Sequence, residues 1–311
     1  MRYKQGLPVS LALAVTIGGV AVAESTDTIR IPMNEWTGQN LSARIMGELL
    51  TDAGYSVEYV TAGAVPQFTA ISQGELHVQP ENWTNNVGDI YQKALDSGAM
   101  KIVGDLGVVA DEGWIYPPYM EERCPGLPNY TALMNCAEAF TSADTYPKGR
   151  LIDYPADWGP RSRALIEKFG LPYVPVPGGS EGSMVAELKG AIAAEEPIIM
   201  MMWQPHWVFA EVDLNWVEWN PIEGNCDEKN QTYEDACGFE QADVVKVVWS
   251  GFEEKWPDAY EFVEKFTLTN EIQNRLILEV DQNGRSVDEV AREWIDHNES
   301  VWQPWVSSID S

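Results

Sequence analysis

The sequence predicts an α/β protein of two lobes, joined by a hinge that the chain crosses twice. Strand-like runs alternate with stretches in which apolar residues recur at helical spacing, which is the pattern of β-α-β units. The length of 311 residues suggests about two domains. The segment 258–305 is helical in pattern and too long for a mere terminus, so we expect it to pack back on the first lobe.

The first lobe opens with a β-α-β unit. A helix at 42–50 places apolar side chains at helical spacing and ends at Gly54. The strands expected in this lobe lie at residues 28–32, 57–60, 75–78 and 102–106. Such alternation predicts a mostly parallel sheet with helices on both faces.

The second lobe opens near Trp114 and repeats this alternation. Its expected strands and helices lie at residues 150–154, 161–169, 183–194 and 198–202. The predicted division of the chain is 1–23 as a signal peptide, 24–112 as the first part of lobe 1, 113–212 as lobe 2, and 213–311 as the return to lobe 1.

The N-terminal segment predicts export. Arg2 and Lys4 precede an uncharged run that ends in Ala21-Val22-Ala23, the small-x-small pattern of a cleavage site. The run contains Pro8 and barely reaches the ~20 residues that a membrane span needs, so cleavage is the better interpretation. We expect a mature periplasmic protein that begins near Glu24.

The charge balance is strongly acidic, with 48 Asp and Glu against 20 Lys and Arg and a formal net charge of −28. A surface this acidic repels nucleic acids and anionic lipids, and it mildly favours a cationic ligand. The sequence also holds no HExxH motif and no phosphate-binding glycine loop. We therefore expect no enzyme and no catalytic residues.

Four cysteines lie in the mature chain, an even number in a compartment that permits oxidation. Their spacing suggests the pairs Cys124–Cys136 and Cys226–Cys237, although four cysteines allow three pairings. Neither pair has the CxxC spacing of a zinc or redox site, so structural disulfides are favoured.

The 13 tryptophans are the strongest functional signal. Six of them lie at or just after expected strands, where α/β lobes place their ligands: Trp36, Trp83, Trp114, Trp158, Trp203 and Trp207. For the other seven we expect positions in the core: Trp216, Trp219, Trp249, Trp256, Trp294, Trp302 and Trp305.

Several indoles around one cleft suit a particular ligand chemistry. Each indole face attracts a desolvated cation by about 0.5–2 kcal/mol. A methylated ammonium or sulfonium has no N–H to donate, so an aromatic box is the physical way to hold it. The alternative, that these rings merely fill the core, is the weaker one for Trp36, Trp83, Trp158 and Trp203.

Four segments carry a family resemblance: Asn34-Glu35-Trp36, Pro80-Glu81-Asn82-Trp83, Tyr154-Pro155-Ala156-Asp157-Trp158-Gly159 and Trp203-Gln204-Pro205-His206-Trp207. In order and over nearly all the mature chain, they resemble the signatures of glycine betaine, choline and proline betaine substrate-binding proteins of ABC importers. The resemblance implies a type II periplasmic binding protein, a monomer that closes on its ligand and delivers it to an ABC permease and ATPase.

The resemblance also implies which residues bind. Trp36, Trp83 and Trp203 match the box walls of the family. Trp158, and either Trp114 or Tyr116, are second choices. No cofactor is implied.

Three polar residues near these walls have open roles. Glu81 could attract a cation, donate to an N-oxide oxygen if burial keeps it protonated, or simply face water. The turn that begins at Asp157 could offer backbone N–H groups to a ligand carboxylate, because it precedes a helix. We interpret His206, in the same segment as Trp207, as a residue that orients its turn.

An acidic loop between the second pair of cysteines holds Asp227, Glu228, Glu234 and Asp235. Oxygen clusters can hold Ca²⁺, but this spacing is not that of an EF-hand, so a solvated loop is favoured over a structural calcium site.

Two rival functions share some of these features. A periplasmic sensor subunit would use the same cleft, and a secreted carbohydrate-active enzyme would use Trp platforms with a carboxylate pair, although nothing isolates such a pair. The residues do not choose among glycine betaine, dimethylsulfoniopropionate, trimethylamine N-oxide, choline and carnitine.

Overall fold

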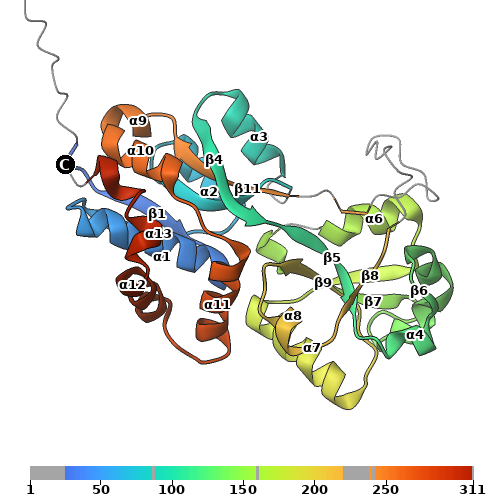
Figure 1. Ribbon diagram of the computed structural model, residues 1–311. Helices are drawn as coiled ribbons and strands as arrows, with labels where there is room; N and C mark the ends of the chain where they lie inside the picture. The colour runs from blue at the N-terminus through green and yellow to red at the C-terminus, as the bar shows by residue number, and fades with distance from the viewer. Residues whose placement is uncertain (1–24, 86–87, 159–160, 220–237, 240–241, 310–311) are drawn as a thin grey trace, which may run out of the picture.

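The computed structural model describes residues 25–85, 88–158, 161–219, 238–239 and 242–309, and it has two α/β lobes side by side (Figure 1). The predicted fold class is confirmed. The predicted signal peptide, the pair Cys226–Cys237 and the acidic residues Asp227, Glu228, Glu234 and Asp235 lie outside the described residues. No described helix combines the length and the apolar character needed to cross a membrane.

The first lobe contains two small sheets. β1 (Ile29–Met33) pairs in parallel with β2 (Val57–Thr61). β11 (Asp243–Trp249) lies between β3 (Val78–Trp83) and β4 (Met100–Val109) and is antiparallel to both. The prediction of a mostly parallel sheet is therefore wrong for this part, because the returning chain enters the lobe in the opposite direction.

Helices cover these sheets, and the tail belongs to this lobe as expected. The helices are α1 (Thr37–Asp52), α2 (Gln67–Ser72), α3 (Gly88–Asp96), α9 (Phe252–Lys255), α10 (Pro257–Lys265), α11 (Asn270–Asp281), α12 (Val287–His297) and α13 (Glu299–Trp302). α1 packs against both α11 and α12, which places the C-terminal helices beside the N-terminal one (Figure 1).

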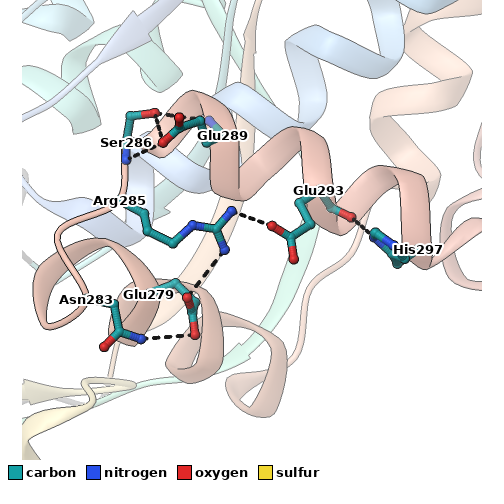
Figure 2. A network of polar contacts seen from close by, with 7 residues as sticks. All are labelled: Glu279, Asn283, Arg285, Ser286, Glu289, Glu293 and His297. Carbon is teal, nitrogen blue, oxygen red and sulfur yellow. Dashed lines mark hydrogen bonds and ion pairs between the residues drawn. The ribbon is translucent and has the colours of Figure 1, made fainter.

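Polar contacts fix the turn between α11 and α12. Ser286 and Glu289 form a capping box at the start of α12. Arg285 contacts both Glu279 of α11 and Glu293 of α12, and the carbonyl of Glu293 lies 2.8 Å from His297 Nδ1 (Figure 2). The two helices are thereby held as one unit on the outer side of α1.

The second lobe has one five-stranded sheet in the order β10-β5-β9-β7-β8. Its strands are β5 (Asp111–Tyr116), β7 (Gly149–Asp153), β8 (Tyr173–Pro177), β9 (Met200–Gln204) and β10 (Asn215–Trp216). β7 is parallel to β8 and β9, whereas β5 is antiparallel to β9 and β10. The remaining elements are α4 (Met120–Arg123), β6 (Pro125–Pro128), α5 (Leu133–Cys136), α6 (Arg161–Phe169), α7 (Glu181–Ala194), α8 (Val208–Glu211) and short 3₁₀ turns at 130–132, 137–140 and 156–158.

The chain passes between the lobes at two places. The first crossing joins β4 to β5 around Ala110, close to the predicted boundary at 112. β10 still pairs with β5 of the second lobe, so the second crossing lies after Trp216 and not at the predicted residue 212. The disulfide Cys124–Cys136 closes a loop within the second lobe.

The seven tryptophans expected in the core do pack against it. Trp256, Trp294 and Trp305 are buried, and Trp216, Trp219, Trp249 and Trp302 are partly buried against the two hydrophobic clusters. Trp83, Trp158 and Trp203 are also buried in the larger cluster, so burial alone does not set the seven apart.

Two helical glycines give a matched test of packing. A Cβ on Gly47 of α1 would come within 2.3 Å of the Tyr59 hydroxyl, whereas one on Gly190 of α7 would meet nothing within 4 Å. We expect Gly47→Ala to lower the free energy of unfolding by about 1–3 kcal/mol through overpacking. Gly190→Ala should raise it by about 0.5–1 kcal/mol, because alanine favours the helix. Urea unfolding measures both; a stabilised Gly47→Ala variant would contradict the packing of α1 on β2.

Candidate functional site

A cavity opens between the lobes and is lined by both. The space inside it, including the part that is open to solvent, is about 440 Å³. The lining residues are Trp36, Ala64, Gln67, Glu81, Asn82 and Trp83 from the first lobe and Glu112, Tyr154, Trp158 and Trp203 from the second. Neither lobe holds the complete set.

The aromatic walls form a connected array. The ring centroids of Trp36 and Trp158 lie 5.3 Å apart across the two lobes, and those of Trp158 and Trp203 also lie 5.3 Å apart. Tyr154 lies 5.5 Å from both Trp158 and Trp203. All three contacts within the second lobe are tilted or edge-to-face, so the rings meet at angles and enclose a space instead of stacking on one another.

Strand ends position three of these rings, in the way that α/β lobes place ligand-binding groups. Trp36 follows β1 and is the N-cap residue of α1. Trp83 is the last residue of β3, because this strand runs from 78 to 83 and not from 75 to 78 as predicted. Trp158 ends the 3₁₀ turn after β7, and Trp203 lies inside β9.

Glu81 connects the first-lobe half of the cavity. Its Oε1 accepts hydrogen bonds from the indole nitrogens of Trp36 at 3.0 Å and Trp83 at 3.2 Å. Its Oε2 accepts from Ser42 Oγ and Gln273 Nε2, each at 2.7 Å. One carboxylate therefore fixes two cavity walls and ties them to α1 and α11.

The environment of Glu81 acts on its charge in two directions. The side chain is 1% exposed, and burial raises its pKa, whereas the four hydrogen-bond donors lower it by favouring the charged form. None of these donors is a cation. Burial is the larger effect, so the pKa of Glu81 lies above its ordinary value, and when ionised this side chain has no basic hydrogen-bond partner among the described residues.

A network of side-chain amides supports this wall from behind. Gln79 Nε2 donates to Asn34 Oδ1 at 2.7 Å and to Gln67 Oε1 at 2.6 Å, while Gln39 Nε2 donates to Gln79 Oε1 at 2.9 Å. The Glu81 backbone N–H donates to the same Gln79 oxygen at 3.2 Å. Fully paired buried amides of this kind rigidify a site.

Five lining residues escaped the sequence analysis: Ala64, Gln67, Asn82, Glu112 and Tyr154. Glu112 accepts a hydrogen bond from the Tyr154 hydroxyl at 2.7 Å and another from Asn85. Asn82 and Tyr154 lie inside two of the motif segments, so position beside a predicted wall was a usable signal for them. Glu112 sits at the lobe crossing, where no motif marks it.

The structure does not bring Trp114 and Tyr116 to the cavity. Both are 0% exposed inside the second lobe, where Trp114 Nε1 donates to Ser162 Oγ at 2.9 Å and Tyr116 Oη to Glu121 at 3.2 Å. Only the last four residues of their strand β5 are buried, and both rings lie in that buried part. The prediction from sequence assumed parallel strands. It therefore did not foresee that the antiparallel β5 places these two rings in the core of the lobe.

Three further candidates lie near the cavity without lining it. Asp157 is exposed. Trp207 Nε1 donates to Asp281 Oδ2 at 2.9 Å, and His206 Nε2 lies 3.2 Å from Glu181 Oε1. These last contacts belong to the rim where the two lobes meet.

Comparisons with known proteins identify the family of the chain. Residues 27–297 match the family described as the substrate binding domain of ABC-type glycine betaine transport system. A trimethylamine N-oxide-binding protein of Pelagibacter ubique is 27% identical over 299 residues, which cover 94% of this chain and 95% of the relative. The resemblance seen in the four sequence segments is confirmed.

Solved structures share the fold. Lactococcal OpuAC, in its closed conformation with glycine betaine, has a TM-score of 0.73 at 20% identity and covers 90% of this chain and 99% of its own. ProX from Borrelia burgdorferi, a glycine betaine and L-proline-binding protein, has a TM-score of 0.77 at 19% identity and covers 91% and 98%.

Two substitutions separate the acceptor role of Glu81 from its charge. Glu81→Leu leaves four buried donors without an acceptor, and we expect it to lower the free energy of unfolding by about 2–4 kcal/mol. Glu81→Gln should cost clearly less, because its amide oxygen still accepts from both indoles while Ser42 and Gln273 can reorient. Urea unfolding of the ligand-free protein measures both. Equal stability of Glu81→Leu and the unsubstituted protein would contradict the hub role of this carboxylate.

Proposed function

The chain belongs to the family of substrate-binding domains of ABC-type glycine betaine transport systems, and on this premise we propose that it captures a small methylated onium or N-oxide compound in the aromatic cavity. The captured compound is then presented to an ABC permease and ATPase. The observation that carries the proposal is the lining itself, in which four indoles and a tyrosine surround a space that also contains two carboxylates.

Cation–π attraction is the proposed source of affinity. Trp83, Trp158 and Trp203 are at most 8% exposed, so a methylated head group among them is largely desolvated. Each contact of this kind contributes from about 0.5 to 2 kcal/mol, more when water is excluded. The methyl groups need no hydrogen-bond acceptor, and the cavity offers them ring faces.

Charge supports a cation and disfavours an anionic group. Glu81 and Glu112 line the cavity, and no Lys or Arg is among its described lining residues. A unit charge 4 Å from a carboxylate gains or loses about 4 kcal/mol at an effective dielectric constant of 20. We therefore expect choline and trimethylamine N-oxide to be favoured over ligands that carry a free carboxylate.

An oxygen on the ligand needs a donor, and Asn82 can supply one. Asn82 lines the cavity, and its buried Nδ2 makes no close hydrogen bond among the described residues, its neighbouring acceptor being the Tyr91 oxygen. Buried donors are normally paired, so an unpaired one beside a cavity calls for a partner. An N-oxide oxygen would satisfy it, which agrees with the trimethylamine N-oxide-binding relative.

The proposed transport role also implies where the protein acts and with which partners. The leader-like N-terminus supports export to the periplasm, where we propose that the protein acts as a monomer. Family membership favours solute binding over a secreted carbohydrate-active enzyme. A sensor subunit for the same ligands is the second candidate, and permease and ATPase genes beside the coding sequence would favour the importer.

Calorimetric titration of the mature protein tests the ligand class. We expect a Kd in the micromolar range or tighter, about −8 kcal/mol, for at least one of choline, trimethylamine N-oxide, glycine betaine, dimethylsulfoniopropionate and carnitine. Replacement of Trp36, Trp83, Trp158 or Trp203 by Ala should each weaken binding by at least ~1 kcal/mol. Trp302→Ala, outside the cavity, should leave affinity unchanged. Unchanged affinity in all four cavity variants would refute the site.

A pair of ligands isolates the role of Asn82. Trimethylamine N-oxide and tetramethylammonium share the methylated nitrogen, but the second has no oxygen to accept a hydrogen bond. Asn82→Leu should weaken trimethylamine N-oxide binding about fivefold to tenfold and change tetramethylammonium binding less than about twofold. An equal loss for both ligands would show that Asn82 shapes the cavity and does not donate to the ligand.

A further inference from the structure

Among the described residues, three hydrogen bonds of side chains outside the cavity lining join the two lobes beside the cavity. Glu181 Oε2 of the second lobe accepts from the Thr37 backbone N–H of the first at 2.8 Å. Asp281 Oδ2 of the first lobe accepts from Trp207 Nε1 of the second at 2.9 Å. Glu211 Oε1 accepts from Gln282 Nε2 at 2.6 Å, from α11 to α8. Each lobe thus supplies a carboxylate to a donor of the other.

From this geometry we propose that Glu181 and Asp281 form a latch that holds the lobes closed, and that Glu181 positions Trp36 by capping helix α1 from the opposite lobe. The inference rests on the proposed function, because Trp36 is a wall of the proposed ligand cavity. Glu181 is a positioning residue and does not line the cavity.

The start of α1 has no cap of its own. Its N-cap residue is Trp36, which makes no side-chain capping hydrogen bond, and its first turn contains no acidic residue. A carboxylate at a helix N-terminus pairs a free N–H and complements the helix dipole. Glu181 supplies this group when the lobes are closed, so the backbone that orients Trp36 is completed by closure.

The side chains around the latch lie close enough together to hold a metal ion, if distance were the only criterion. One ligand atom each from Glu181, His206 and Asp281 lies within 4.8 Å of the others. The carboxylate oxygens, however, already receive donors from Thr37, Trp207 and His206. His206 Nδ1 accepts from the Val208 N–H at 3.2 Å, which leaves its proton on Nε2, toward Glu181. Protein donors therefore satisfy the atoms that a metal would need.

Charges around the latch give it a pH dependence. Glu181, His206 and Asp281 face one another, and Lys189 of α7 pairs with Glu211 beside Trp207. Burial and the nearby Glu181 raise the pKa of Asp281, although its exposed side limits the effect. Closure brings the two carboxylates together, so closure takes up protons. As pH falls from neutral through the raised pKa of Asp281, the latch should therefore stabilise the closed state more strongly, and ligand affinity should increase.

Choline, whose charge does not change with pH, is the probe for the test. Glu181→Gln should raise its dissociation rate and its Kd about fivefold at neutral pH and leave the association rate nearly unchanged, because the latch acts after encounter. Trp207→Phe keeps an aromatic ring, although a smaller one, and removes the N–H donor to Asp281. It should raise the dissociation rate about threefold. The control is Glu187→Gln, on the same helix but paired with Arg150 inside the second lobe, and it should match the unsubstituted protein.

The pH profile separates a latch from mere loss of packing. The ratio of Kd in Glu181→Gln to Kd in the unsubstituted protein should rise as pH falls from about 7 to 5, because only the unsubstituted protein gains from proton uptake by the carboxylate pair. The titration of Glu81 is common to both proteins and cancels in the ratio. A constant ratio, or a loss of affinity on addition of EDTA, would overturn the latch.

Amide exchange of residues 37–40 reads the cap directly. In the presence of choline, these amides should exchange faster in Glu181→Gln than in the unsubstituted protein or in Glu187→Gln. If none of the onium compounds binds the unsubstituted protein, the proposed function fails, and exchange in the ligand-free protein still tests the latch. Equal exchange in all three proteins would refute it.

Discussion

The geometry of the cavity depends on one buried carboxylate. Glu81 accepts hydrogen bonds from two indoles, a serine and a glutamine, and these donors come from β3, from α11 and from the first residues of α1 and its cap. Because the donors are neutral, they orient the carboxylate without cancelling its charge. The same group therefore sets the angle of two ring faces and, when ionised, places a negative charge beside them.

The division of the lining between lobes follows from the same constraint. Glu81 organises the first-lobe walls before any ligand arrives, since all its partners belong to that lobe. The second lobe contributes Trp158 and Trp203, which pack on Tyr154. Each lobe thus carries a preformed half of the cavity lining.

Sequence reasoning found the indoles and Glu81, and it missed most of the other lining residues for physical reasons. Trp36, Trp83, Trp158 and Trp203 line one cavity, and they were predictable because an unusual residue recurs at or near successive expected strands. Glu112 lies at a lobe crossing, where local pattern says little about the third dimension. Trp114 was misplaced because β5 is antiparallel, and strand direction is decided by long-range pairing that periodicity does not encode. The fold class was predictable, and the sheet order was not.

The placement of β11 between β3 and β4 has a consequence for biogenesis. The central strand of the first lobe's three-stranded sheet is contributed by the last quarter of the chain, so that sheet cannot assemble while the C-terminal segment is still being synthesised. Without this middle strand, β3 and β4 lack the pairing partner that they share. Stable assembly of the sheet is thereby deferred until more than three quarters of the polypeptide has been made.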